Sequence, residues 1–571
     1  MTIIRLSFVY VVWSACALVP RLAGYAPKST TAHHVMLAYF TMEALFAIAY
    51  RIMAFQIGRR RPPTDYDAKF LRNTVKNVLE SNMSSSASSP SATPMTSALS
   101  SRRGSLEPRA RRKLRFGSVS SDSGYGSSSS DRGNASGSDS EERLPVPIGA
   151  LVEEPEIASN YNFLSPKLAA DDPRAVDFRE ASRHWFHGAD FSSICRTQVE
   201  QWMSWSLYGQ PLEEVVRERR QSVSQGVKID KLPQNENIGR DKLETVEHSV
   251  DLWEARAGTK LRRGSNPAVD VLRLTLDPVR VLARPLSFYV VVWCAQQFYN
   301  FRLAQRGFVE ETHGGLRWLV RTPAGWIADE TDESTRPFVF LHGLGLGPVQ
   351  YAPFLNKITQ DKDFEKRPIA ILIQPHLSMS IFDSAYLNPP EAKTCARAFR
   401  VMALARGFAK SGTTVLSHSN GTIVHGWLLK NEPDLVKRSC LIDPVAFILW
   451  EPTLPYNFLY TAARSPMQYL MRYFVARELG VANTLQRRFD WISSLLRPCE
   501  IPGKGDPRLA SVFLSERDAI VDTPRVASYL TGEGMGEGEG MTVFPKQKHG
   551  DAMLGIGKPF EQVMAWCRND A

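Results

Sequence analysis

Hydrophobic and polar positions divide the 571-residue chain into segments of different character, beginning with two apolar runs. The first run, Leu6–Pro20, is short for a bilayer span of about 20 residues. With Arg5 before it, this run also fits the apolar part of a signal peptide. The second run, Val35–Phe55, is long enough to cross a membrane although it contains Glu43 and Arg51. A second span directly downstream favours an anchor over a cleaved signal.

The two runs therefore predict a membrane anchor of two transmembrane helices over residues 1–60, with a buried helical hairpin of a soluble protein as the alternative. Basic residues are concentrated after the second run, at Arg51 and Arg59–Arg61, whereas the loop between the runs carries only Arg21 and Lys28. The positive-inside rule then predicts that everything after the anchor lies in the cytosol. The pattern does not identify the organelle.

A Ser-rich segment with few apolar residues follows and predicts a disordered linker over residues 61–150, because it cannot bury enough surface to offset the entropy of ordering. The pattern Arg-Arg-x-Ser occurs at Ser105 in this segment and again at Ser222 and Ser265. Each match resembles the site of a basic-directed kinase, and chance matching is the alternative for any one of them. Three matches make such a kinase a candidate partner.

Residues 151–308 have mostly helical spacing and predict an accessory region. One helix is expected to begin with Asp190 or Ser192 as its cap and to end at Gly209. Later in the region, the apolar run Leu286–Cys294 is too short to span a membrane. It fits a buried helix or an amphipathic element on an anionic membrane surface. The arginines that border this run are Arg273, Arg280, Arg284, Arg302 and Arg306.

After residue 308 the pattern changes to short apolar strands separated by helices. Seven strand candidates are GLRWLVRTP, RPFVFLHG, RPIAILIQP, TTVLSHS, RSCLIDPV, RLASVFLSE and GMTVFPKQ. This alternation predicts an α/β fold with a largely parallel sheet covered by helices on both faces.

The segment Thr413–Leu429 combines a strand, a tight cluster of small residues and a helix. Its centre has the pattern small-x-Ser-x-Gly around Ser419, with Ser417 where glycine is commoner. A sharp turn between strand and helix requires small residues and lifts the serine to the top of the sheet. The following helix directs its first N–H groups to the same place, where they can hold an anion.

From Gly307 to Ala571 these features resemble the α/β-hydrolase superfamily, of the AB hydrolase-1 type. The resemblance implies an oxyanion hole made by the N–H groups of Leu344, in a His-Gly-Leu-Gly loop, and Asn420. The loop lacks the Gly-Lys-Ser/Thr of a phosphate-binding loop. The hydrolase domain is expected to cover residues 309–571.

The superfamily order of Ser, Asp and His is met by Ser419, Asp518 and His549, each after a predicted strand. Asp518 could instead cap a helix, and His549 could be a loop histidine, but the order and positions favour a catalytic triad. Asp443, after the strand that follows the Ser419 helix, is the alternative acid. A seryl nucleophile implies acyl transfer rather than the chemistry of relatives that use an aspartate.

The family usually inserts a cap between the strand that precedes Asp443 and the next strand, here at about residues 444–508. This stretch is rich in aromatic residues and Met, which fits a long apolar acyl chain as well as a cap with its own core. The chain as a whole resembles uncharacterised membrane-anchored fungal hydrolases. No cofactor and no metal is implied.

Composition changes this picture little. The seven cysteines are widely spaced, as in neither a disulfide framework nor a zinc ribbon. The net charge of +10 is unevenly distributed, which indicates basic tails and surfaces, and no nucleic-acid partner is expected. The sequence thus predicts a membrane-anchored serine hydrolase acting on a lipid or another hydrophobic ester. An acyltransferase with the same triad and a non-catalytic membrane scaffold are the alternatives.

Overall fold

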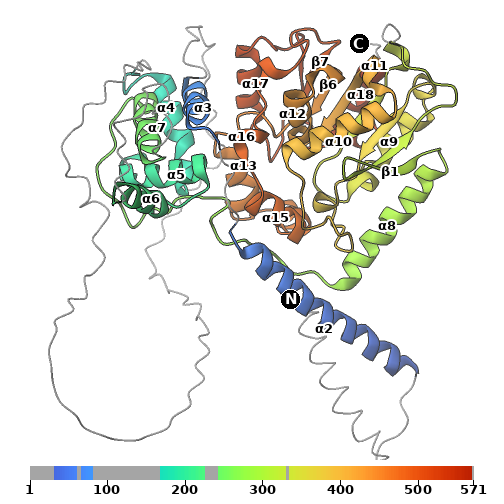
Figure 1. Ribbon diagram of the computed structural model, residues 1–571, viewed down its shortest axis with the longest axis horizontal. Helices are drawn as coiled ribbons and strands as arrows, with labels where there is room; N and C mark the ends of the chain where they lie inside the picture. The colour runs from blue at the N-terminus through green and yellow to red at the C-terminus, as the bar shows by residue number, and fades with distance from the viewer. Residues whose placement is uncertain (1–30, 61–65, 81–166, 225–241, 330–332, 569–571) are drawn as a thin grey trace, which may run out of the picture. The chain divides into compact units, whose positions relative to one another are not determined.

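Eight strands form one mixed sheet in the order β1-β2-β4-β3-β5-β6-β7-β8 (Figure 1). β2 pairs with β1 and β4 in antiparallel fashion, and all pairings among β3 to β8 are parallel. The strands are β1 (Val309–His313), β2 (Leu316–Arg321), β3 (Phe338–Leu341), β4 (Ile369–Leu372), β5 (Thr413–His418), β6 (Val436–Ile442), β7 (Ala510–Ser515) and β8 (Met541–Phe544). All seven strand candidates are confirmed, and β1 is the strand that was not predicted.

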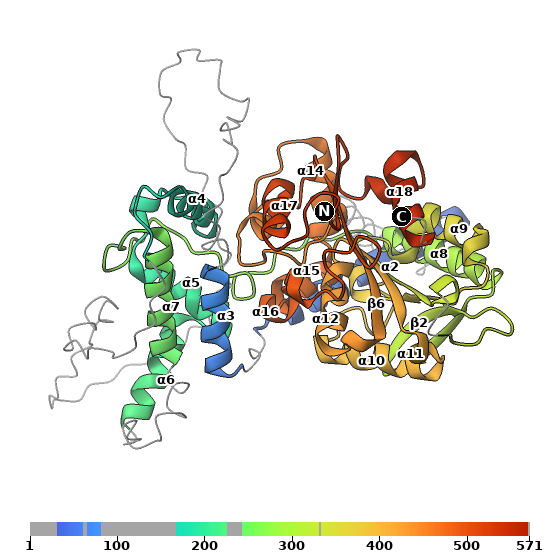
Figure 2. The same cartoon turned by 90° about the horizontal axis from the view of Figure 1, so that it is seen from above.

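Alternating side chains along the strands pack into separate apolar clusters on the two faces of the sheet. In β3, Val339 and Leu341 belong to the cluster of helices α10 and α12, whereas Phe338 and Phe340 belong to that of α9 and α18. These helices are α9 (Ala352–Gln360), α10 (Ala392–Ala405), α12 (Gly421–Asn431) and α18 (Gly557–Arg568) (Figure 2). The mostly parallel sheet with flanking helices fits the α/β-hydrolase fold.

The computed structural model describes residues 31–60, 66–80, 167–224, 242–329 and 333–568, all within one compact unit. The run Leu6–Pro20 and the kinase-type site at Ser105 lie outside the described residues. Part of the predicted linker is helical, because Ala68–Glu80 form α3. Its Leu71, Val75 and Leu79 are buried at helical spacing, so this part of the chain carries an apolar stripe that the Ser-rich composition of its neighbours concealed.

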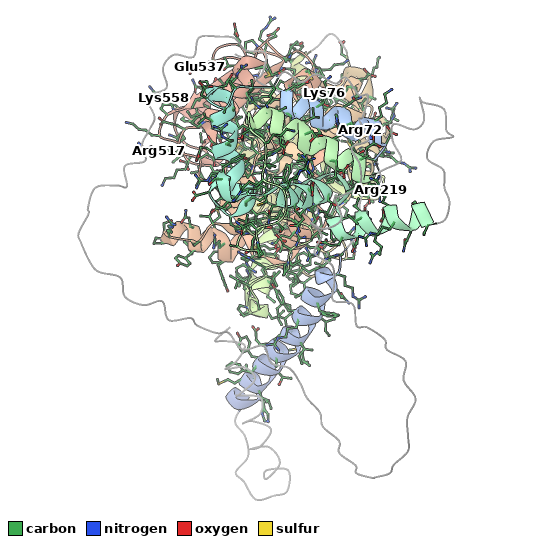
Figure 3. All side chains as sticks on the ribbon, turned by 90° about the vertical axis from the view of Figure 1, so that its left-hand side faces the viewer. Arg72, Lys76, Arg219, Arg517, Glu537 and Lys558 are labelled. Carbon is green, nitrogen blue, oxygen red and sulfur yellow. The ribbon has the colours of Figure 1, made fainter. Side chains whose placement is uncertain are left out.

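The accessory region consists of α4 (Pro173–Ser182), α5 (Arg196–Tyr208), α6 (Leu212–Ser224) and α7 (Lys242–Ala257). α3 packs on α7, and the Nε atom of Arg72 on α3 donates to Thr245 Oγ1 at 3.1 Å (Figure 3). The helix predicted to start at Asp190 or Ser192 starts instead at Arg196, after a short 3-10 turn, and its cap is Cys195. Gly209 ends it as predicted, in the left-handed conformation that glycine adopts without strain.

The predicted cap contains short helices between β6 and β7. They are α13 (Thr453–Pro455), α14 (Pro466–Met471), α15 (Leu479–Arg487) and α16 (Trp491–Ser494), with π-helical turns at Tyr456–Tyr460 and Arg472–Ala476. Phe458 is buried, whereas Tyr469 and Leu470 are exposed. The aromatic side chains of this stretch therefore do not all serve one core.

Among the described residues, one helix is long and apolar enough to cross a membrane, α2 (Thr31–Gly58), over His34–Gly58. α2 contacts α8 (Leu286–Ala304). The predicted run Leu286–Cys294 forms the first half of this 19-residue helix. Arg284, which borders this run, is buried and stacks 5.0 Å from the centre of the Tyr473 ring, so it does not face an anionic surface, which was one of the two predicted settings. The guanidinium of Arg284 donates a hydrogen bond to the carbonyl of Leu282 and lies inside the protein.

Candidate active site

Ser419 lies in the turn between β5 and α12, with a backbone φ of 52°. A non-glycine residue in this left-handed region is strained, as expected for a nucleophile elbow. The turn depends on Gly421, because a Cβ atom there would lie 2.2 Å from the carbonyl oxygen of Leu341 in β3. A Cβ on Gly343 would likewise lie 2.9 Å from the Cβ of Ser419. Small residues are thus needed on both sides of the serine.

The three residues predicted as a triad form one hydrogen-bonded chain. His549 Nε2 lies 2.8 Å from Ser419 Oγ, and His549 Nδ1 lies 2.6 Å from Asp518 Oδ2. The loops after β7 and β8 supply Asp518 and His549. The other oxygen of Asp518, Oδ1, accepts hydrogen bonds from the N–H groups of Ile520 and Val521, at 2.7 and 3.0 Å. The carboxylate is therefore held in place from both sides.

Charge and burial act in opposite directions on His549. Burial alone would lower its pKa, but the hydrogen bond to Asp518 and the negative charges of Asp518 and Asp443 outweigh it and raise the pKa above the usual value. Such a histidine is stabilised in its protonated form, which is the form that a proton from Ser419 would produce.

Leu344 and Asn420, the predicted oxyanion donors, line the same cavity as Ser419. In the described part of the chain, neither backbone N–H donates to another residue. The carbonyl of Leu344 accepts from Gln350 Nε2 at 3.0 Å, which fixes its peptide. The N–H of Gly343 is engaged with the Tyr351 hydroxyl at 2.9 Å. The N–H groups of Leu344 and Asn420 therefore remain candidates to stabilise a developing oxyanion beside Ser419.

Asp443, the alternative acid, follows β6 and is buried with a φ of 42°. Its oxygens accept from the N–H of Ser515 at 2.9 Å and of Gly550 at 2.7 Å. Burial raises the pKa of this carboxyl, and the nearby charge of Asp518 adds to the effect. The geometry therefore pairs Asp518 with the His549 ring and Asp443 with the backbone beside it.

Among the described residues, Asp443, Asp518 and His549 are the one group whose side chains lie close enough together to hold a metal ion. One donor atom each from Asp443, Asp518 and His549 lies within 4.8 Å of the others. Both nitrogens of His549 and the oxygens of the two carboxylates already have hydrogen-bond partners. The arrangement is accounted for without an ion.

A second buried pair near Ser419, formed by Tyr351 and His418, was not predicted from the sequence. The Tyr351 hydroxyl lies 2.7 Å from His418 Nδ1 and also accepts from the Gly343 N–H. Burial keeps the pKa of His418 well below its usual value, so this ring is neutral. The pair links the residue before Ser419 to the loop of the predicted oxyanion donor. Its only sequence signal is the histidine in Ser-His-Ser, and the tyrosine is distant along the chain.

The cavity beside Ser419 has a volume of about 1210 Å³, more than a typical small-molecule pocket. Besides Ser419, its lining includes the polar residues Gln374 and His376 and charged residues such as Arg256, Glu451 and Arg525. Its wall includes aromatic side chains of the cap and of the accessory helices, among them Trp202, Trp205, Trp450, Phe458 and Trp491. The cap aromatics thus contribute both to packing and to the cavity wall.

Two of the predicted kinase sites lie in the described residues. Ser222 is exposed near the end of α6, and its hydroxyl donates to the carbonyl of Glu218 at 3.1 Å. Ser265 is exposed and its hydroxyl accepts from Gln198 Nε2 at 3.0 Å. Both are distinct from the residues around Ser419.

Comparison with known proteins finds no matching family model and no matching curated protein. Among solved structures, a bacterial membrane phospholipase A is 14% identical, over 50% of this chain and 94% of its own, with a TM-score of 0.33. Naproxen esterase from Bacillus subtilis is 13% identical over 48% and 96%, with a TM-score of 0.31. A peroxisomal α/β-hydrolase from Saccharomyces cerevisiae is 13% identical over 44% and 79%, with a TM-score of 0.30. Likeness at this level assigns neither a family nor a substrate.

Proposed function

We propose that the protein is a serine hydrolase that cleaves a hydrophobic, lipid-like carboxylic ester. The supporting observation is the chain of hydrogen bonds from Asp518 through His549 to Ser419, where Ser419 borders a large cavity with aromatic walls. An acid, a base and a nucleophile in this order have the geometry of acyl-transfer catalysis.

In the first half of the reaction, Ser419 Oγ attacks the ester carbonyl carbon while its proton moves to His549 Nε2. Asp518 accepts the Nδ1–H of the same ring and stabilises the imidazolium. The carbonyl oxygen becomes an oxyanion, which receives hydrogen bonds from the N–H groups of Leu344 and Asn420. When the tetrahedral intermediate collapses, the C–O bond to the alcohol breaks and His549 gives its proton to the leaving oxygen.

In the second half, water replaces the departed alcohol and attacks the acyl group on Ser419. His549 removes a proton from the water, and a second tetrahedral intermediate forms in the same oxyanion hole. Its collapse releases the carboxylic acid and returns the proton to Ser419 Oγ. Every step uses side chains or N–H groups of this chain and one water molecule.

The substrate class follows from the cavity. Its volume of about 1210 Å³ and its tryptophan and phenylalanine side chains favour long apolar groups, because burial of each methylene contributes about 0.8 kcal/mol. We therefore expect the ratio kcat/KM to rise with acyl length.

The proposal is tested with a series of p-nitrophenyl esters from short to long acyl chains, using wild type and the Ser419→Ala variant. Long chains should be preferred and the variant should be inactive on all of them. Equal activity of the variant would overturn the catalytic assignment, and preference for the shortest ester would overturn the substrate class.

We also infer that the protein is associated with a membrane through α2 and that its catalytic part is cytosolic. Supporting this orientation, the exposed Arg51, Arg59 and Arg60 lie in the second half of α2 and just after it, where they can meet the anionic lipids of a cytoplasmic leaflet. The acceptor sequences at Asn82 and Asn134 should then stay unglycosylated in a eukaryotic cell. A mobility shift after glycosidase treatment of the full-length protein would contradict this orientation.

Phosphorylation by a basic-directed kinase remains a proposal for Ser105, Ser222 and Ser265. The exposure of Ser222 and Ser265 supports it for these two sites. Incubation of the protein with such a kinase and phosphopeptide mapping tests it, and absence of phosphate from all three serines would refute it.

A further inference from the structure

The exposed side of α8 is apolar. The exposed fractions are 68% at Val291, 65% at Phe298 and 59% at Phe301, and Val290 and Cys294 are exposed as well. These five positions follow the spacing of one helix face. A helix next to water has polar residues on that side, so this face has the composition of one that contacts an apolar phase.

α2 also exposes large apolar side chains along its whole length. They are Val35, Met36, Tyr39, Met42, Leu45, Ile48, Ile52 and Phe55. A few of its residues pack against the protein, and Tyr50 and Ile57 share an apolar cluster with Tyr289 and Val292 of α8. Both helices thus combine residues packed on the protein with large apolar side chains exposed on its surface.

Glu43 joins the two helices directly. Its buried carboxylate accepts from the N–H groups of Leu286 at 2.7 Å and Ser287 at 3.0 Å. These are the first N–H groups of α8, where the helix dipole favours a negative charge. Glu43, an acidic residue within an apolar run, therefore caps the N-terminus of a neighbouring helix.

Hydrogen bonds between α2 and the rest of the protein continue to the end of α2. The Tyr50 hydroxyl donates to the carbonyl of Leu282 at 2.9 Å, and Arg487 Nη2 donates to the carbonyl of Gly58 at 3.4 Å. From Glu43 to Gly58 is 58 − 43 = 15 residues, or about 22 Å of helix, against a hydrocarbon core of roughly 30 Å.

A transmembrane α2 would therefore carry its protein contacts into the hydrocarbon core. The buried carboxylate of Glu43 and the irregular backbone at Leu282, which Tyr50 contacts, would lie at that depth, where polar groups are costly. A helix lying along the membrane surface avoids this cost, because its protein side stays at the headgroups while its apolar side enters the acyl layer.

We propose that α2 does not cross the bilayer, and that α2 and α8 together form a membrane-docking surface that enters one leaflet of a lipid bilayer. The apolar face of α8 lies at the boundary of headgroups and acyl chains, and the exposed Arg302 near its end meets anionic headgroups. This docking surface rests on the proposed membrane association but not on the chemistry of Ser419.

The test measures depth with an environment-sensitive thiol reporter on the full-length protein in vesicles of phosphatidylcholine and phosphatidylserine. Cys294 carries the reporter in a variant with Cys16 and Cys499 changed to Ser, and Cys499 carries it in the matched control, with Cys16 and Cys294 changed to Ser. The cysteines at 195, 395, 440 and 567 are buried and stay in place. Three more variants, His34→Cys, Leu45→Cys and Gln56→Cys, place it at exposed positions on one side of α2, in a background with Cys16, Cys294 and Cys499 all changed to Ser.

Lipids with a nitroxide at a shallow or a deep position then quench the reporter. For an in-plane α2, the ratio of shallow to deep quenching is similar at positions 34, 45 and 56, which share one side of the helix, and Cys294 is quenched roughly twofold or more above Cys499. A crossing α2 would place position 45 about 15 Å deeper than the two ends, so preferential deep quenching there would overturn the proposal.

Absence of quenching at Cys294 would also overturn it, since the α8 face would then be covered by protein, such as residues 1–30 or a second copy. Circular dichroism of each variant checks that it is folded. None of these quenching measurements depends on catalysis. A result that overturns the docking surface therefore leaves the hydrolase proposal untouched, and the reverse also holds.

Discussion

The hydroxyl of Ser417 lies 2.8 Å from Nδ1 of His425, one helix turn into α12. This contact explains the departure from the commoner glycine two residues before the nucleophile. The other ring nitrogen of His425 lies 3.2 Å from the Ser439 hydroxyl, so the buried imidazole has a partner on each side. Burial lowers the pKa of His425 to about 3, and the ring is neutral. Ser417 therefore ties β5, α12 and β6 together beneath Ser419.

Replacing Ser417 with Gly should lower stability and leave the reaction intact. The change leaves His425 Nδ1 buried without a partner, which costs about 1–3 kcal/mol. Chemical denaturation should show this loss, while kcat of the folded enzyme stays near that of wild type. Ser439→Ala, which removes the other partner of the same ring, is the matched control. An unchanged midpoint in both variants would contradict the role of His425 as a buried link.

The two carboxylates should differ sharply in their effect on catalysis. Ser419→Ala and His549→Ala should each lower kcat by roughly four orders of magnitude or more. Asp518→Asn should lose less than the serine change, because the Ser419 hydroxyl and the two proposed oxyanion donors remain. Asp443→Asn should be the mildest of the four, since Asp443 bonds to backbone rather than to the ring. A severe Asp443→Asn with a harmless Asp518→Asn would reverse the assignment of the acid.

The pH dependence should report the charges around His549. The base must be neutral to accept the Ser419 proton, so kcat/KM rises with pH through the pKa of His549. Because that pKa is raised, the midpoint of the rise should lie above the usual value of 6.5. Asp443→Asn removes one of the charges that raise it and should move the midpoint to lower pH. An unchanged or higher midpoint would show that Asp443 does not act on His549 electrostatically.

Replacing Glu43, whose carboxylate caps α8, should weaken the attachment of α2 to the rest of the protein. Glu43→Ala leaves the N–H groups of Leu286 and Ser287 without their acceptor, at a cost of about 1–2 kcal/mol. Glu43→Gln keeps an acceptor oxygen and should be milder. Limited proteolysis in detergent should release α2 faster from the alanine variant than from wild type. Equal rates in all three proteins would mean that the Glu43 contacts do not hold α2.

Apolar periodicity predicted the sheet because β2 to β8 are apolar enough to be recognised one at a time. β1 escaped notice because VEETH is polar and lies at the sheet edge, where its side chains stay largely exposed. Only its antiparallel pairing with β2 across Gly314 and Gly315 identifies it as a strand. The start of α5 was misplaced for a related reason, since Asp190 and Ser192 are common capping residues and Cys195 is not.

Local motifs marked Ser419, and chain order marked Asp518 and His549, because the turn and the strand ends leave traces in the sequence. The contacts of Tyr351 with His418 and of Glu43 with α8 left no such trace. The first contact joins residues that are 67 positions apart, and the second joins residues that are more than 240 positions apart. Only folding brings these residues together. The choice between Asp518 and Asp443 likewise needed geometry, since both follow a strand end.

The central claim, that Ser419 is an activated nucleophile, is tested most directly with a fluorophosphonate probe on the full-length protein. A serine with a hydrogen-bonded histidine and an oxyanion hole attacks the phosphorus and stays covalently labelled. We predict one labelled peptide, containing Ser419, with labelling abolished in Ser419→Ala and strongly slowed in His549→Ala. A folded wild-type protein that takes up no label, or a Ser419→Ala variant that is labelled as fast as wild type, would contradict the account.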